Sequence, residues 1–297
     1  MDDSRLKRTS LGYFEVAEKP SQEELDTYYA EIYYQQGLGY YDKSYDEDEL
    51  KYIKLKIKQL SYIVNNLMKI TKGKLLDVGC GEGFTLKHYA ELGWSVKGID
   101  FSKVGLEQQN PSMLNYVDIG DIYEILSCYK NNNDKYDVIW LNNVLEHVLN
   151  PVNLLHDLKK LLYNDGVLVV TVPNDFSDLH EYCFNNNLIR NRFWIALPDH
   201  ISYFSYNSLC VIANESGWSC EDVISDFPID LYLFHPGSNY VNDKSLGHAA
   251  HRARIQIELL LFDRNIEDVN DYYRSMAKVG FGRNLTAFLQ PNTKSAK

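Results

Sequence analysis

Glycines at every second position follow an apolar run in LLDVGCGEGFTL, the first segment of the sequence that could bind a ligand. Residues 75–78 predict a buried strand, and Gly79, Gly81 and Gly83 come directly after it. Glycines let the backbone turn sharply and approach a ligand without a Cβ in the way. The helix predicted next would present N–H groups and a partial positive charge at its N-terminus. This pattern is typical of a nucleotide-binding loop.

An acidic residue stands where such a site needs one. Asp100 ends a second apolar run, about 20 residues after the first glycine, the spacing at which a carboxylate accepts from the ribose hydroxyls. Dinucleotide sites require GxGxxG, but Phe84 occupies the position of the third glycine. The loop also lacks the GK[ST] of a phosphate-binding loop. The pattern GxGxG followed by an acid therefore favours another nucleotide-like cofactor.

The elements around this loop predict an α/β fold. From residue 73 to 174, apolar runs alternate with helix-like stretches, which is typical of a parallel sheet with right-handed crossovers. A helix ending at Gly217, a strand over 218–224, a long helix over 246–262 and a last strand over 283–290 follow. The strands expected in the first part cover 74–78, 94–100, 114–119, 136–141 and 167–173.

The sequence predicts one domain with elaborations. Residues 1–62 are rich in tyrosine and predict short amphipathic helices, too few and too polar to form a core of their own. Residues 63–297 form the main domain. Irregular segments at about 175–204 and 228–275 interrupt it, and we expect these two inserts to bind the second substrate.

Composition excludes several classes of protein. The 297 residues carry a formal charge of -11, with a mean hydropathy of -0.35, so we expect no nucleic-acid partner. No apolar run approaches the roughly 20 residues that cross a bilayer, and the first ten residues, MDDSRLKRTS, lack the apolar region typical of a signal peptide. We therefore expect no secretory signal, no membrane partner and a cytoplasmic protein. The five cysteines form no CxxC pair, which argues against a disulfide framework or a thiolate zinc site.

Five motifs occur in order: LDVGCGEG, GIDFS, IGD, DVIWLNNVLEHVLNP and GVLVVTVPN. In this combination, residues 73 to about 225 resemble the class I S-adenosylmethionine-dependent methyltransferases, in the branch that acts on small molecules and in glycan pathways. The resemblance implies a Rossmann-like, seven-stranded, mostly parallel sheet with helices on both faces. It adds an N-terminal helical lid, inserts after strands 5 and 6, and S-adenosyl-L-methionine as the cofactor.

The resemblance also implies how the loop and its acid bind that cofactor. Asp77, with Gly79, Gly81 and Gly83, would hold the methionine part. Asp100 would bind the ribose diol.

The adenine would lie further along the same sheet edge. Phe101 would flank the ring, and Asp121 would accept from the adenine amino group with Ile122 beside it. Asp118 competes with Asp121 for this role, because VDIGD holds both acids. Asn142 would offer its backbone carbonyl to the amino group of the methionine part.

A tyrosine of the N-terminal extension could complete the site. In relatives such a segment covers the cofactor, and a tyrosine hydroxyl reaches its carboxylate. The candidates are Tyr33, Tyr34, Tyr40 and Tyr41, with Tyr34 and Tyr41 preferred. A lid of this kind would exclude water from the reaction.

Two histidines could activate the methyl acceptor. A hydroxyl must lose its proton, and neutral histidine is the usual base near pH 7. His147 follows the fourth strand in LNNVLEHV, and His200 lies in the first insert in LPDHISYFS. A packing role for His147 stays open, and the sequence does not choose between the two. His147 could instead help to bind a metal, but no carboxylate cage is visible, so we expect none.

Other side chains suggest the acceptor. A cationic cluster in an acidic chain suggests an anionic acceptor, although a solvated helix face explains it equally well. Aromatic residues could form a platform for a sugar or belong to the core. The cations are His248, His251, Arg252, Arg254, Arg190, Arg192 and Arg283, and the aromatic residues are Trp194, Tyr203, Phe204 and Tyr240.

These features predict O-methylation of a small polar, anionic acceptor. A looser resemblance of the insert segments implies a sugar, a nucleotide-linked sugar or a phosphorylated building block of a bacterial surface polysaccharide. An NAD-dependent sugar-nucleotide oxidoreductase or epimerase is one alternative, disfavoured by Phe84. A non-catalytic protein that keeps the fold for a partner is another. The chain would act as a monomer or a homodimer.

Overall fold

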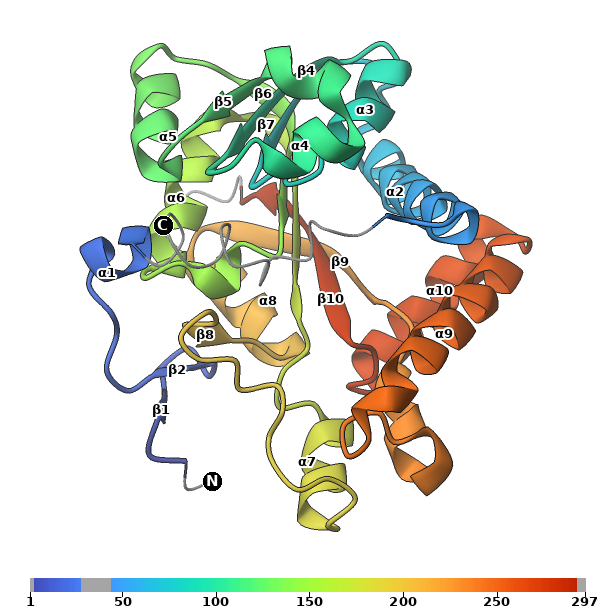
Figure 1. The fold of residues 1–297 in the computed structure, drawn as a ribbon. Coiled ribbons are helices and arrows are strands. Elements are labelled where there is room, and N and C mark those ends of the chain that lie inside the picture. The colour runs from blue at the N-terminus through green and yellow to red at the C-terminus, as the bar shows by residue number, and fades with distance from the viewer. Residues whose placement is uncertain (1–2, 28–43, 293–297) are drawn as a thin grey trace.

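The centre of the molecule is a seven-stranded sheet with the strand order β5-β4-β3-β6-β7-β10-β9 (Figure 1). The computed structural model describes residues 3–27 and 44–292. Within this sheet only β10 runs antiparallel to its neighbours, β7 and β9. The predicted Rossmann-like, mostly parallel sheet is confirmed. Its strands are β3 (Lys74–Val78), β4 (Ser95–Asp100), β5 (Val117–Ile119), β6 (Tyr136–Asn142), β7 (Leu162–Pro173), β9 (Trp218–Ser225) and β10 (Asn284–Pro291).

Helices cover both faces of the sheet, as expected. The alternation of side chains along β3 divides the core, since Leu76 packs on one face and Leu75 on the other. The first face is covered by α5 (Ile122–Asn131), α6 (Pro151–Leu161) and α8 (Tyr206–Glu215). The second is covered by α2 (Glu47–Met68), α3 (Phe84–Glu91), α4 (Val104–Gln109) and α10 (Ile266–Lys278). No helix in the described ranges is both long and apolar enough to cross a membrane.

Strands, and not the predicted helices, begin the N-terminal segment. β1 (Leu6–Arg8) and β2 (Phe14–Val16) pair, and β2 also pairs with β8 (Ser202–Tyr203) of the first insert. The helical prediction missed the turn between them, where Gly12 has φ +88°. A short helix, α1 (Gln22–Thr27), follows. The domain boundary expected at residue 62 falls inside α2, which joins the extension to the main domain without a break.

The second insert contributes to the core of the domain. It lies between β9 and β10, and it contains α9 (Gly247–Phe262), close to the helix predicted over 246–262, and the unpredicted α10. α9 packs on α2, and α10 packs on β9. Val269 and Tyr273 of α10 are buried in the core of the second face. This part of the insert therefore covers the sheet, whereas the first insert carries α7 (Asp178–Asn185) and β8.

Asp226, directly after β9, links the ends of β9 and β10. One carboxylate oxygen accepts the backbone N–H groups of Arg283 at 2.7 Å and Asn284 at 2.8 Å, and the other accepts the Asn284 side-chain amide at 2.6 Å. We expect D226A to lower the free energy of unfolding by about 1–3 kcal/mol, because it leaves shielded donors without an acceptor. Urea denaturation measures the change. The exposed Asp165→Ala is the matched control, and an equal small effect of both variants would contradict this role.

Candidate active site

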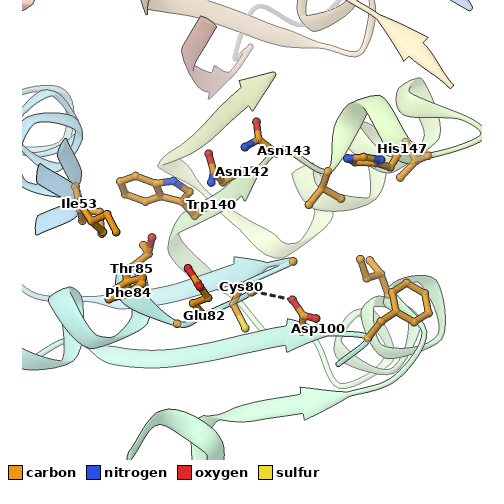
Figure 2. A pocket seen from close by; sticks show the side chains of 18 of the residues that line it. Ile53, Cys80, Glu82, Phe84, Thr85, Asp100, Trp140, Asn142, Asn143 and His147 are labelled. Carbon is orange, nitrogen blue, oxygen red and sulfur yellow. Dashed lines mark hydrogen bonds between the residues drawn. The ribbon is translucent and has the colours of Figure 1, made fainter. Parts of the chain in front are cut away.

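A cavity of about 520 Å³ opens where β3, β4 and β6 end. The glycine loop after β3, Asp100 at the end of β4 and Asn142 at the end of β6 all line it. Figure 2 shows these side chains around one space, with Ile53 of α2 at one side and His147 at the other. Ligands bind at this edge in open α/β sheets. The structure therefore brings the predicted loop, acid and histidine to one cavity.

Backbone conformation and close packing both require glycine in the loop. Gly79, Gly81 and Gly83 have φ values of 73°, 54° and 74°. A Cβ at Gly79 would lie 2.4 Å from Val144 Cγ2, and one at Gly83 would lie 2.5 Å from Leu106 Cδ2. Residues with a side chain rarely adopt such φ values. The loop can therefore pass close to Val144 and Leu106 only because these positions are glycine.

Asp100 connects the loop to the next strand. Its Oδ2 accepts the N–H of Gly81 at 2.7 Å (dashed in Figure 2), and its Oδ1 accepts the N–H of Ser102 at 2.9 Å. Asp77 is also buried, but it is not among the residues that line the cavity. Burial, and then the charge of Asp100, raises the pKa of Asp77 to about 8. A direct contact of Asp77 with the methionine part stays a prediction.

The expected adenine end of the cavity has the expected side chains. Phe101, Asp121 and Ile122 all line it. Asp121 also caps α5, since its side chain accepts the N–H of Glu124 at 2.8 Å. Asp118 bonds to Lys97 at 2.6 Å and to the Tyr129 hydroxyl at 2.6 Å and does not line the cavity. The geometry favours Asp121 over its competitor.

His147 and His200 lie against each other, with ring centroids 4.9 Å apart and planes at 83°. His147 lies at the end of a short 3-10 helix (Leu145–His147) and lines the cavity. Its Nδ1 is 2.9 Å from the backbone oxygen of Asp199, which requires a proton on Nδ1. His200 is not a lining residue. Both predicted histidines therefore belong to one cluster, but only His147 faces the cavity.

The surroundings of the two histidines shift their pKa values in opposite directions. Burial alone would lower the pKa of His147, but the hydrogen bond to Asp199 and the charges of Asp199 and Glu146 raise it to about 9. Burial and the charge of His147 lower the pKa of His200 to about 4. Near pH 7 the pair therefore holds its proton on His147, while His200 stays neutral.

A buried acid, Glu146, lies beside the histidine pair. Glu146 is 1% exposed, and neither of its carboxylate oxygens has a hydrogen bond within the described residues. Burial raises its pKa to about 7. Glu146, His147 and His200 each offer one ligand atom within 4.8 Å of the others, a set that could hold a metal ion. From the sequence, too few acids were expected around His147 for such a set. The expectation of a reaction without a metal stays a prediction.

Most cations expected to bind an anionic acceptor are bound to acids instead. His251 Nε2 is 2.9 Å from Glu49 Oε1, and Arg252 pairs with Asp46 and Asp48. These contacts join α9 to the N-terminus of α2. The same holds for Arg192, which pairs with Glu181, for Arg254, which is 3.9 Å from Glu258, and for Arg283, which is 3.6 Å from Asp175. Ion pairs within the protein therefore account for most of these cations, and the contacts from α9 to α2 differ from the solvated helix face that was the expected alternative.

The expected aromatic platform belongs largely to the core. Trp194, Tyr203 and Phe204 are each 1% exposed, so none presents a face to a sugar. Tyr240 donates to Asp230 at 2.6 Å. The four tyrosines considered for the lid, Tyr33, Tyr34, Tyr40 and Tyr41, lie outside the described residues.

Sequence reasoning missed several lining residues. Tyr45 donates to Glu82 of the glycine loop at 2.9 Å, and it lies edge-on to Phe84. Tyr52 and Lys56 of α2 also line the cavity, four residues apart on one helix face. Their spacing was the only signal in the sequence. It was missed because residues four apart on a helix usually indicate packing between helices.

We expect D100A to abolish binding of S-adenosylhomocysteine. The variant removes the expected ribose ligand and the acceptor of the N–H of Gly81 in the loop. Isothermal titration calorimetry measures the affinity, and D100N, which keeps the side-chain size, should weaken binding strongly but leave the loop folded. Asp118→Asn is the matched control, since Asp118 does not line the cavity. Unchanged affinity in D100A would contradict the assignment.

Comparison with known proteins identifies the family. The family described as "Methyltransferase domain" matches residues 45–223. The ubiquinone biosynthesis O-methyltransferase of Pasteurella multocida is 32% identical over 127 residues, and that of Actinobacillus pleuropneumoniae is 33% identical over 125 residues. Each match covers 39% of this chain and 52% of the relative. The chain thus spans about half the length of the curated relatives it matches.

Solved structures share the fold. A SAM-dependent methyltransferase from Archaeoglobus fulgidus is 20% identical, with a TM-score of 0.50 over 87% of this chain and 99% of that one. The plantazolicin methyltransferase BpumL, solved with a monoazolic desmethylPZN analog and SAH, is 18% identical, with a TM-score of 0.53 over 91% of this chain and 94% of that one. Because the family matches more than half of the chain, this protein belongs to the methyltransferase-domain family and has the class I S-adenosylmethionine-dependent methyltransferase fold.

Proposed function

We propose that this protein transfers the methyl group of S-adenosylmethionine to a hydroxyl oxygen of a small acceptor. The observation that carries the proposal is one cavity that joins the glycine loop, Asp100 and His147. The loop and Asp100 provide the binding groups for the cofactor, and His147 provides a base beside it. BpumL, which shares the fold, was solved with the product SAH.

Methyl transfer depends more on the relative position of the acceptor oxygen and the methyl group than on the strength of the base. The acceptor oxygen attacks the methyl carbon, the carbon–sulfur bond breaks, and its electron pair neutralises the sulfonium to give S-adenosylhomocysteine. Holding oxygen and methyl about 3–3.5 Å apart and in line supplies much of the rate. The hydroxyl proton leaves to a base during the attack.

We assign that base to His147. Its Nδ1 proton is held by the carbonyl of Asp199, so in the neutral ring Nε2 is the nitrogen that accepts a proton. The carboxylate of Asp199, 3.2 Å from Nδ1, stabilises the charged ring that results. His200 packs edge-on against His147 and positions it. The sequence had left the choice between the two rings open.

Of the acceptor, we propose only that it carries the hydroxyl group that is methylated. The curated relatives are named O-methyltransferases, which supports oxygen as the atom that is methylated. The hypothesis that the acceptor is an anionic sugar of a surface polysaccharide is now supported only by the looser sequence resemblance. The cations that suggested it are paired with acids. A lid role for the N-terminal segment is supported by Gln22, Leu25 and Tyr45, which line the cavity.

Transfer of label from methyl-labelled S-adenosylmethionine into a fractionated cell extract tests this function. We expect label in the small-molecule fraction with the unmodified protein and none with D100A. Counting protein, nucleic acid and lipid separately identifies any other acceptor class. Cofactor binding without transfer to any fraction would support the non-catalytic alternative, and stabilisation by NAD but not by S-adenosylhomocysteine would support the oxidoreductase.

The pH dependence of kcat tests His147. Only the neutral ring accepts a proton, and its pKa is raised to about 9, so kcat should rise with pH until about pH 9. Asp199→Asn removes a charge that raises this pKa, so the rising limb should move to lower pH by roughly one unit or more.

Replacement of the ring completes this test. His147→Ala should lose the limb and about 10²- to 10⁴-fold in kcat with cofactor affinity kept. His156→Ala, exposed on α6, is the matched control. An unshifted limb in Asp199→Asn would contradict the assignment.

A further inference from the structure

Two partly buried thiol groups lie against each other at one edge of the molecule's main sheet. Cys210 of α8 and Cys220 of β9 have their sulfur atoms 3.6 Å apart, within hydrogen-bonding distance for sulfur. All five cysteines are among the described residues, and no other two of them make such a contact. The pair is ten residues apart in the sequence, so the fold, and not a CxxC spacing, brings the thiols together.

The core holds the two elements that carry these thiols. On α8, Leu209 and Ile212 are buried on the first face of the sheet. On β9, Cys220 comes two residues after the fully buried Trp218, so both side chains point to that same face. Gly217, with φ +80°, lies in the turn between helix and strand. The backbone beside both sulfur atoms is therefore fixed, and their separation changes mainly by side-chain rotation.

A disulfide bond is within reach of this geometry. Its two sulfur atoms are about 2.05 Å apart, so the thiols need to approach by only about 1.5 Å. Rotation of a cysteine side chain toward its partner moves the sulfur atom by such a distance. Both residues are partly exposed to solvent, which gives a small oxidant access to the pair. By contrast, Cys80 and Cys183 are buried, and Cys128 is exposed without a second thiol beside it.

The contact makes the two thiols chemically different. The hydrogen bond with the Cys220 thiol lowers the pKa of Cys210, although burial acts in the opposite direction. The same hydrogen bond, and then burial, raises the pKa of Cys220, and the nearby acids Asp222 and Glu221 add to this shift. Because the thiolate is the reactive form of cysteine, Cys210 is the better nucleophile of the two. Cys220 is then the second thiol, placed to react with the oxidised product.

We propose that Cys210 and Cys220 are a redox-active pair that a hydroperoxide oxidises to a disulfide between α8 and β9. The Cys210 thiolate attacks one oxygen of hydrogen peroxide, the oxygen–oxygen bond breaks, and the hydroxide that leaves takes up a proton. Cys210 is now a sulfenic acid. The Cys220 thiol attacks its sulfur, the sulfur–oxygen bond breaks, and hydroxide leaves as water with the thiol proton. Two thiols and one hydrogen peroxide give one disulfide and two waters.

The bond would join a helix of the first face to β9, the strand at one end of the sheet. Closing this short loop restricts the unfolded chain, so we expect the oxidised protein to unfold at a temperature about 3–8 °C higher than the reduced protein. Neither cysteine lines the cavity, so the affinity for S-adenosylhomocysteine should be the same in both states. The proposal therefore stands apart from the proposed function.

Mass spectrometry of the full-length protein after treatment with hydrogen peroxide tests the pair. We expect a cross-link between the peptides that hold Cys210 and Cys220, with the loss of two hydrogen atoms, and recovery of both thiols with dithiothreitol. Cys210→Ser and Cys220→Ser should each form no cross-link, and the two variants keep the test valid if one does not fold. Cys128→Ser, which removes the exposed cysteine without a thiol partner, is the matched control and should form the cross-link as the unmodified protein does.

Three results would overturn the proposal. In the first, both thiols stay reduced, or Cys210 gains oxygen and forms no cross-link. In the second, cross-links to the buried Cys80 or Cys183 form in equal yield, which would show that the chain unfolds before it reacts. In the third, the disulfide leaves the unfolding temperature unchanged or lowers it, which would show that the native fold does not accommodate the bond.

Discussion

The hydrogen bond between the N–H of Gly81 and the carboxylate of Asp100 is the contact around which the site is organised. It joins the glycine loop after β3 to the end of β4, so two strands fix the floor of the cavity together. Glycines let the loop pass close to Val144 and Leu106, where a Cβ at Gly79 or Gly83 would clash. The positions of the proposed ribose, methionine and adenine groups all follow from this contact.

The histidine pair depends on a different part of the chain. Asp199 and His200 come from the first insert, and the N–H of Ile201 donates to the backbone oxygen of Glu146. The small sheet of β1, β2 and β8 holds the end of this insert in place, so the N-terminal strands support the base indirectly. Charge then separates the roles of the two rings, since Asp199 and Glu146 favour a proton on His147 while His200 stays neutral. The main sheet thus forms the proposed cofactor site, and the first insert forms part of the proposed acceptor site. Such a division lets one fold serve different acceptors.

The strands of the main sheet could be predicted because their signal is local. Residues 74–78 are an apolar run bounded by polar residues and glycine, and β3 has those bounds. Residues 114–116 were expected to be strand but form part of a 3-10 helix (Pro111–Tyr116), whose first residue is proline. β1 and β2 are short, and their partner β8 is almost 200 residues away, so no local pattern distinguishes them from helix.

The functional residues also divide into those with a local signal in the sequence and those whose role depends on distant contacts. Asp100 and the glycines were predicted from spacing, because the loop and the strand end define the geometry by themselves. The choice between Asp121 and Asp118 required the structure, which shows Asp118 bound to Lys97 and Tyr129. The cationic cluster of α9 suggested a ligand only because its partners on α2 are about 200 residues away in sequence. The lining residue Lys56 was missed because a lysine on an amphipathic helix is usually solvated.

A crystal structure of the protein with S-adenosylhomocysteine would show directly how the cavity binds the cofactor. We predict both ribose hydroxyls within hydrogen-bonding distance of Asp100, adenine beside Asp121 and Ile122, and the sulfur facing the end of the cavity that His147 lines. A nucleoside bound outside this cavity, or bound with its sulfur turned away from His147, would contradict it.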